Sequence, residues 1–180
     1  MDTRPIGVFD SGLGGLSVVR QLQALLPSED LVYFGDTGRV PYGTRSPATI
    51  ERYARQDCRF LLDQQVKFII AACGTVSSVA APVLQALPVP AMGVVEPTTE
   101  AALAATRNGR VGILGTTATV RSGAFHRAMA QQRPDIQVFA QSCPILSPWW
   151  KADGSNRITK PPPRWLAVIC APCRIKGWIP

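Results

Sequence analysis

The feature that most constrains the fold is an alternation of short apolar segments with longer segments of helical periodicity through the first 140 residues. The apolar segments lack the polar alternation of a sheet with one face in water, so we expect buried strands at Ile6–Phe9, Leu31–Phe34, Phe68–Ala72, Met92–Val95, Val111–Leu114 and Ile136–Phe139. Helices are expected between them, at Gly15–Leu26, Pro47–Gln65, Val76–Leu87, Thr98–Arg107 and Thr119–Gln132. Strict alternation predicts an α/β fold, with a parallel sheet flanked by helices on both faces.

Parallel sheets bind ligands at the carboxyl ends of their strands, so the turns after the strands are the first places to look for function. Three turns carry polar residues or glycines: Asp10–Gly15, Gly35–Thr37 running on to Pro41–Gly43, and Cys73–Thr75. The first turn lacks the last glycine of a dinucleotide fingerprint, and no Gly-Lys-Ser/Thr follows it. Its glycines open a helix, whose free N–H groups suit a carboxylate as well as a phosphate.

Two side chains at these turns have a structural and a chemical interpretation. Asp10 and Ser11 could bind a ligand, or they could satisfy backbone donors and cap the helix, and the first turn favours neither. Cys73 follows a strand and precedes a helix, a position that tends to lower a thiol pKa from its reference of about 8.5 and so favours a thiolate. The alternative, a small buried hydrophobe, is the better interpretation for Cys58, which lies within an expected helix.

The charge of the chain is concentrated in its last part. The net charge is +7, but residues 1–150 carry thirteen Lys/Arg against eleven Asp/Glu, whereas residues 151–180 carry six against one. Nucleic acid is therefore a disfavoured partner for the first part of the chain. All four tryptophans and the Pro161–Pro163 run also lie after residue 147, and we expect residues 148–180 to form a divergent, poorly ordered tail.

Neither the cysteines nor the hydropathy predicts export, a metal or a membrane. Five cysteines without framework spacing indicate free thiols, and Cys170–Cys173 is a lone CxxC in a chain with one histidine, so we expect no metal site. No apolar run approaches the length of a membrane span, and the N-terminus lacks a signal-peptide pattern. The expected location is the cytoplasm.

The turns together resemble the ordered motifs of the glutamate racemase family. The resemblance rests on Ile6–Leu16, Phe34–Thr37, Val40–Gly43, Ala71–Thr75, Gly93–Pro97, Gly112–Thr119 and Ser142–Pro144. It implies a two-domain racemase-like fold, with a first α/β domain at 1–97 and an incomplete second domain at 98–147. It also implies cofactor-independent interconversion of L- and D-glutamate for peptidoglycan in a bacterial cytoplasm, with glutamate as the small-molecule substrate and room for a homodimer.

Family members place two thiols on opposite sides of the substrate α-carbon, one removing the proton and the other returning one. By resemblance, Cys73 is the first thiol and Asp10 assists its proton transfers. The same resemblance places Asp10, Ser11, Tyr42, Gly43, Gly74 and Thr75 around the glutamate, with Thr116 and Thr119 as weaker candidates. This role agrees with the chemistry, because an α-proton beside a carboxylate is barely acidic and needs a positioned base.

The chain departs from the family at two places. Gly74 stands where the family has asparagine. The family's Gly-Cys-Thr-His motif and its acidic residue after the Cys-Pro segment are absent; Cys170 and Cys173 lack the flanking Thr-His, and His126 is expected to be an exposed helix residue. A shifted reading frame after Leu146 is one hypothesis for the tail. We therefore expect impaired racemisation.

Three alternatives to that function remain open. The first is a non-catalytic glutamate-binding remnant, and the second is an aspartate racemase-like enzyme. The third is a module that binds nucleic acid or a protein through the basic tail.

Overall fold

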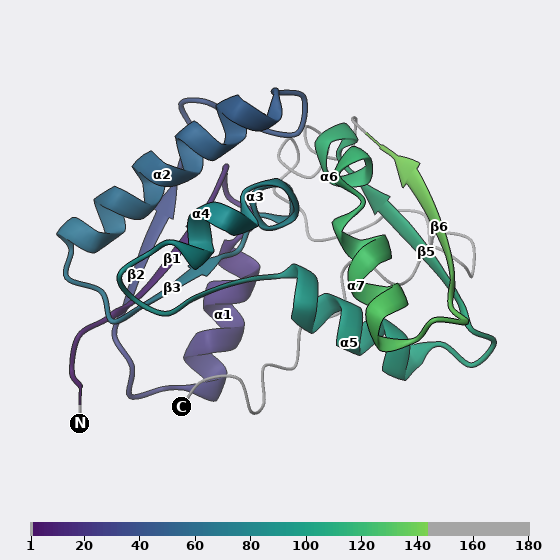
Figure 1. Ribbon diagram of the computed structural model, residues 1–180. Coiled ribbons are helices and arrows are strands. Elements are labelled where there is room, and N and C mark those ends of the chain that lie inside the picture. Colours follow the sequence, from purple (N-terminus) through teal and green to yellow (C-terminus); the bar gives the residue numbers. More distant parts are fainter. Residues whose placement is uncertain (1, 144–180) are drawn as a thin grey trace, which may run out of the picture.

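The computed structural model describes residues 2–143, which form two parallel β-sheets with associated helices (Figure 1). The strands are β1 (Ile6–Asp10), β2 (Leu31–Gly35), β3 (Phe68–Ala71), β4 (Ala91–Gly93), β5 (Arg110–Gly115) and β6 (Gln137–Ser142). The helices are α1 (Leu16–Leu25), α2 (Pro47–Asp63), α3 (Gly74–Val79), α4 (Ala81–Gln85), α5 (Val95–Ala105), α6 (Thr117–Ser122) and α7 (Ala124–Gln132). The predictions for the tail at 148–180 and for the CxxC lie outside the described residues.

The first sheet has the strand order β2-β1-β3-β4, and every pair in it is parallel. Helices cover both of its faces, as the alternation predicts. Leu22 of α1 packs on Ile6, Val8 and Ile70 on one face. On the other face α2, α3 and α4 contribute to a core that includes Phe9, Ile50, Leu61, Ile69, Val76 and Leu84. The expected α/β architecture is confirmed for this sheet.

Two of the expected helices are each divided in two. The helix expected at Val76–Leu87 is interrupted at Ala80, because Pro82 lies in the first turn of α4 and a proline in a helix interior clashes with the preceding turn. The helix expected at Thr119–Gln132 is interrupted at Gly123, whose φ of +64° is left-handed and ends α6. None of the described helices combines the length and the apolar character needed to cross a bilayer.

The second sheet consists, in the described part of the chain, of β5 paired parallel to β6. One face packs on α5 and α7, where Ala102 and Met129 contact Val111 and Ile113. The other face is open among the described residues, and Phe139 on it is 53% exposed. The prediction that both strands are buried on two faces is therefore wrong here, because the described helices supply a single covering layer.

Candidate active site

The strand order places the ends of β1 and β3 side by side. Phe9 and Ala71 are partners in the parallel register, and the Ala72 N–H donates to the Phe9 carbonyl over 2.8 Å. Because parallel strands end at the same sheet edge, Asp10 and Cys73 lie close together there although 62 residues separate Ser11 from Cys73. The structure thus brings together three of the residues that the resemblance singled out.

The Cys73 thiol is buried and points at the first turn. Its residue is 4% exposed, and its S–H donates to Ser11 Oγ over 3.4 Å. Burial raises the pKa of the Cys73 thiol, and so does the Asp10 charge, while the Ser11 hydroxyl and the N–H of Val76 oppose that rise. The expectation that the helix start lowers this pKa is wrong, because desolvation and the Asp10 charge outweigh the hydrogen bonds that oppose the rise.

The glycine-rich turn is closely fitted around Asp10. Asp10 Oδ2 accepts the Gly15 N–H over 3.1 Å, and a Cβ at Gly15 would lie 2.8 Å from the Asp10 Cβ, so no other residue fits at position 15 without movement. The Tyr33 hydroxyl donates to the Gly12 carbonyl over 2.9 Å. Helix α1 has Gly15 as its N-cap, so Ser11 does not cap it. Asp10 does satisfy one backbone donor, as its structural interpretation expects.

A chain of hydroxyl groups extends from this edge toward the second sheet. Thr75 Oγ1 lies 3.0 Å from Thr116 Oγ1, which lies 3.0 Å from Thr119 Oγ1. The Gly43 carbonyl accepts the Ala118 N–H over 3.0 Å, and a Cβ at position 43 would lie 2.4 Å from the Thr116 Cβ. Gly43, Thr75 and both weaker candidates therefore lie where the segment that follows β3 contacts the segment that follows β5.

Gly74 and Tyr42 differ in what they can offer to a ligand. A Cβ at Gly74 would meet no heavy atom within 4 Å, so open space surrounds this position. Tyr42 is 1% exposed, and its hydroxyl lies within hydrogen-bond distance of Asp36 Oδ2 and, at 2.9 Å, of Asp57 Oδ2, which share its single proton. Its hydroxyl is thus occupied by carboxylates, and a contact from Tyr42 to a ligand would have to come from its backbone.

The carboxylates around Tyr42 were not among the predicted site residues. Asp57 lies in the middle of α2 and is fully buried. A signal for it exists in the sequence, because Ala54, Cys58 and Leu61 place it on the apolar face of the helix. A lone acidic residue on such a face indicates a buried ion pair.

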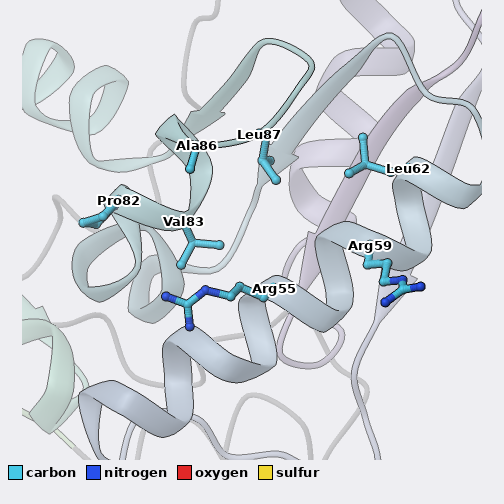
Figure 2. Close-up of a pocket in the computed structure, with 7 residues that line it drawn as sticks. All are labelled: Arg55, Arg59, Leu62, Pro82, Val83, Ala86 and Leu87. Atoms are coloured by element: carbon cyan, nitrogen blue, oxygen red, sulfur yellow. The ribbon is translucent and has the colours of Figure 1, made fainter.

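A surface cavity of about 270 Å³ lies elsewhere, between α2 and α4 (Figure 2). Its lining consists of five apolar side chains and two arginines: Leu62, Pro82, Val83, Ala86, Leu87, Arg55 and Arg59. None of the residues at the sheet edge contributes to it, so it is separate from the Cys73 site. Among residues 2–143, no cluster of three or more His, Cys, Asp or Glu could hold a metal ion.

The burial of the thiols predicts an order of alkylation. Cys58 is fully buried, and burial raises its pKa to about 12, whereas Cys73 borders the open space at Gly74. In iodoacetamide labelling followed by mass mapping, we expect Cys73 to react before Cys58. Because the Cys73 pKa is raised, its rate should still be climbing at pH 9 rather than levelling off. Faster labelling of Cys58 in the folded protein would contradict the placement of Cys73 at an open site.

His126 and Cys143 both lie outside the first sheet. His126 is exposed on α7, as predicted. Cys143 follows β6, is partly exposed, and its N–H donates to the Gly115 carbonyl over 2.8 Å.

Sequence comparison identifies relatives over most of the chain. The profile of the family described as Asp/Glu/Hydantoin racemase matches residues 6–145. The glutamate racemase of Geobacter metallireducens is 45% identical over 149 residues, which are 82% of this chain and 55% of that protein. The glutamate racemase of Chlorobaculum tepidum is 47% identical over 146 residues, 80% of this chain and 54% of that protein. The chain spans about half the length of the curated relatives it matches.

Solved structures give the same result. A glutamate racemase isoform of Bacillus anthracis superposes with a TM-score of 0.82 at 32% identity, over 85% of this chain and 58% of that one. The glutamate racemase of Francisella tularensis, solved in complex with D-glutamate, superposes with a TM-score of 0.78 at 40% identity, over 88% of this chain and 60% of that one. The proteins that the chain resembles in sequence and those that it resembles in fold are therefore both named glutamate racemases.

Proposed function

The chain belongs to the Asp/Glu/Hydantoin racemase family, and from this premise we propose that its sheet edge is the proton-transfer half of a glutamate racemase site. The observation that carries the proposal is the meeting of Cys73, Ser11 and Asp10 at the carboxyl edge of a parallel sheet. The reaction is the cofactor-independent interconversion of L- and D-glutamate. The relatives at 45% and 47% identity are named for glutamate, which favours glutamate over aspartate as the substrate.

In this proposal Cys73 is the base that removes the α-proton from one face of glutamate. The thiol must first lose its own proton, and its raised pKa opposes that loss. A bound glutamate brings an α-ammonium group. Its positive charge would offset the negative charge of Asp10 and so lower the Cys73 pKa. Asp10 then takes up and returns the thiol proton. Substrate binding and activation of the base are thereby linked.

The two carboxylates of glutamate need donors, and the described residues offer two kinds. The Gly15 N–H already donates to Asp10, so the donors proposed at the turn before α1 are the backbone N–H groups of Gly12–Gly14. Thr75, Thr116 and Thr119 present hydroxyls. Ser11, Gly43 and Gly74 complete the proposed binding surface, with Tyr42 contributing through its backbone alone.

The biological role that follows is the supply of D-glutamate for peptidoglycan in a bacterial cytoplasm. A homodimer remains a prediction of the family resemblance. Glutamate is the proposed small-molecule partner.

Incubation with L-glutamate in deuterated water tests the proposal. Loss of the α-proton signal in NMR with unchanged optical rotation would establish a half-reaction at Cys73, and loss with inversion would establish the complete reaction. Binding of glutamate without exchange would support the non-catalytic alternative. The absence of both glutamate binding and α-proton exchange would refute the proposal.

The open space at Gly74 predicts that a single substitution improves the site. Gly74→Asn restores the side-chain amide of the family, and since nothing lies within 4 Å of the new Cβ the change should not distort α3. One added hydrogen bond to the ligand should tighten glutamate binding about fivefold, measured by isothermal titration calorimetry. The control is Gly112→Asn, an equally open position on β5. Equal gains in both variants, or none at position 74, would contradict this role.

A further inference from the structure

A buried polar cluster joins helix α2 to the segment between β2 and α2. Arg39 Nε lies 2.6 Å from Asp36 Oδ2, and Arg39 Nη2 lies 2.8 Å from Asp57 Oδ1. The Tyr42 hydroxyl contacts Asp36 Oδ2 and, over 2.9 Å, Asp57 Oδ2, and these two carboxylates share its single proton. Both oxygens of Asp57 thus hold side chains of this segment.

Asp57 is the fixed point of the cluster. It has no exposed surface, and its helical neighbours Ala54, Cys58 and Leu61 are also fully buried in the core of the first sheet. Residues 36–46 contain neither helix nor strand, and the backbone hydrogen bonds within this segment are isolated turn contacts, such as those from Arg39 N–H to Asp36 and from Arg45 N–H to Tyr42. A buried carboxylate without partners is costly, and this cost favours the arrangement in which Arg39 and Tyr42 remain bound to it.

The far end of the same segment lies at the proposed glutamate site. Gly43 directly follows Tyr42, and its carbonyl accepts the Ala118 N–H over 3.0 Å. The contact between Gly43 and Thr116 is too close for any added Cβ, and Thr116 bonds to Thr75 two residues after Cys73. A displacement of Tyr42 would therefore reach the hydroxyl chain through Gly43.

We propose that Asp57 is a positioning residue, which holds Arg39 and Tyr42 so that Gly43 stays seated on Thr116 and Ala118. Its effect on glutamate binding rests on the function proposed above, whereas the seating of Gly43 does not. Asp57 acts through Tyr42, since it has no exposed surface of its own to offer a ligand. Burial raises the pKa of Asp57 to about 6, so the carboxylate is mainly ionised at neutral pH and can pair with Arg39.

The Ala118 amide reports on this seating. It lies in the first turn of α6, where N–H groups lack partners within the helix, so its protection from hydrogen exchange depends on the Gly43 carbonyl. We expect Asp57→Ala to speed exchange at Ala118 about tenfold in the full chain, measured by NMR, because the segment is released locally. Two other amides should keep their rates: Ala72, which donates to Phe9, and Val120, which donates to Thr116.

Three further variants complete the experiment. Asp57→Asn keeps an oxygen acceptor of the same shape and should restore most of the Ala118 protection. Tyr42→Phe removes the hydroxyl and keeps the buried ring in the core, and it should speed exchange about threefold. This variant decides the question if Asp57→Ala does not fold. The control Glu51→Ala removes a partly exposed carboxylate of α2 paired with Arg55 and should change nothing.

Unchanged protection at Ala118 in Asp57→Ala and Tyr42→Phe would overturn the proposal, as would equal losses at Ala118, Ala72 and Val120, which indicate global destabilisation. Glutamate titrations separate this result from the proposed function. If the wild type binds glutamate and Asp57→Ala binds it about fivefold more weakly, both the glutamate site and the positioning role of Asp57 are supported. Absence of wild-type binding refutes the glutamate site, and the Ala118 exchange rates alone then decide the role of Asp57.

Discussion

Replacing Cys73 with alanine is expected to abolish α-proton exchange of glutamate in deuterated water, a loss of at least about a thousandfold. The thiol lies at the carboxyl edge of the sheet, bonded to Ser11 and within the electrostatic influence of Asp10. The Ser11 hydroxyl cannot replace it as the base, because a hydroxyl is a far weaker acid than a thiol and stays protonated. The rate of loss of the α-proton signal in NMR measures the effect.

The matched control is Cys143→Ala. Cys143 is also a free thiol, but it follows β6 and its N–H bonds to Gly115 at the end of the second sheet. We expect this variant to exchange at the wild-type rate and to unfold at the same temperature as Cys73→Ala, within a few degrees. Exchange that survives in Cys73→Ala and disappears in Cys143→Ala would move the base to the second sheet.

The sequence predicted the elements that organise the sheet edge, because their patterns are local. Apolar runs of four or five residues specify β1, β2 and β3, and their parallel alignment brings Asp10 next to Cys73 without further information. The helical periodicity alone predicted uninterrupted helices through Ala80 and Gly123. The helix-breaking effects of Pro82 and of glycine at position 123 were both available in the sequence and show that backbone chemistry outweighs periodicity there.

The chemistry of the site was harder to predict, since it depends on burial. A cysteine before a helix suggests a lowered pKa, but the pKa of Cys73 is raised because the side chain is desolvated and faces the negative charge of Asp10. Tyr42 was expected by resemblance to line the glutamate site, and its hydroxyl bonds to Asp57, 15 residues away in the sequence. Neither effect can be derived from the order of the motifs, because both arise from contacts between separate elements.

The chain of 180 residues is expected to form D-glutamate at least about a thousandfold more slowly than the 1–1000 per second typical of enzymes. A single thiolate can take and return a proton on one face only, which leaves the configuration unchanged, so inversion needs a donor on the other face.

The described residues offer no suitable second thiol. Among residues 2–143 the other cysteines are Cys58, fully buried on the core side of α2, and Cys143, at the end of the second sheet. Nor does the sequence contain the Gly-Cys-Thr-His motif of the family. Chiral chromatography of the product, run beside the exchange assay, separates the two steps: we expect α-proton exchange with retained configuration. D-glutamate produced within about tenfold of ordinary enzymatic rates would contradict this expectation and assign the second proton transfer to Cys170 or Cys173.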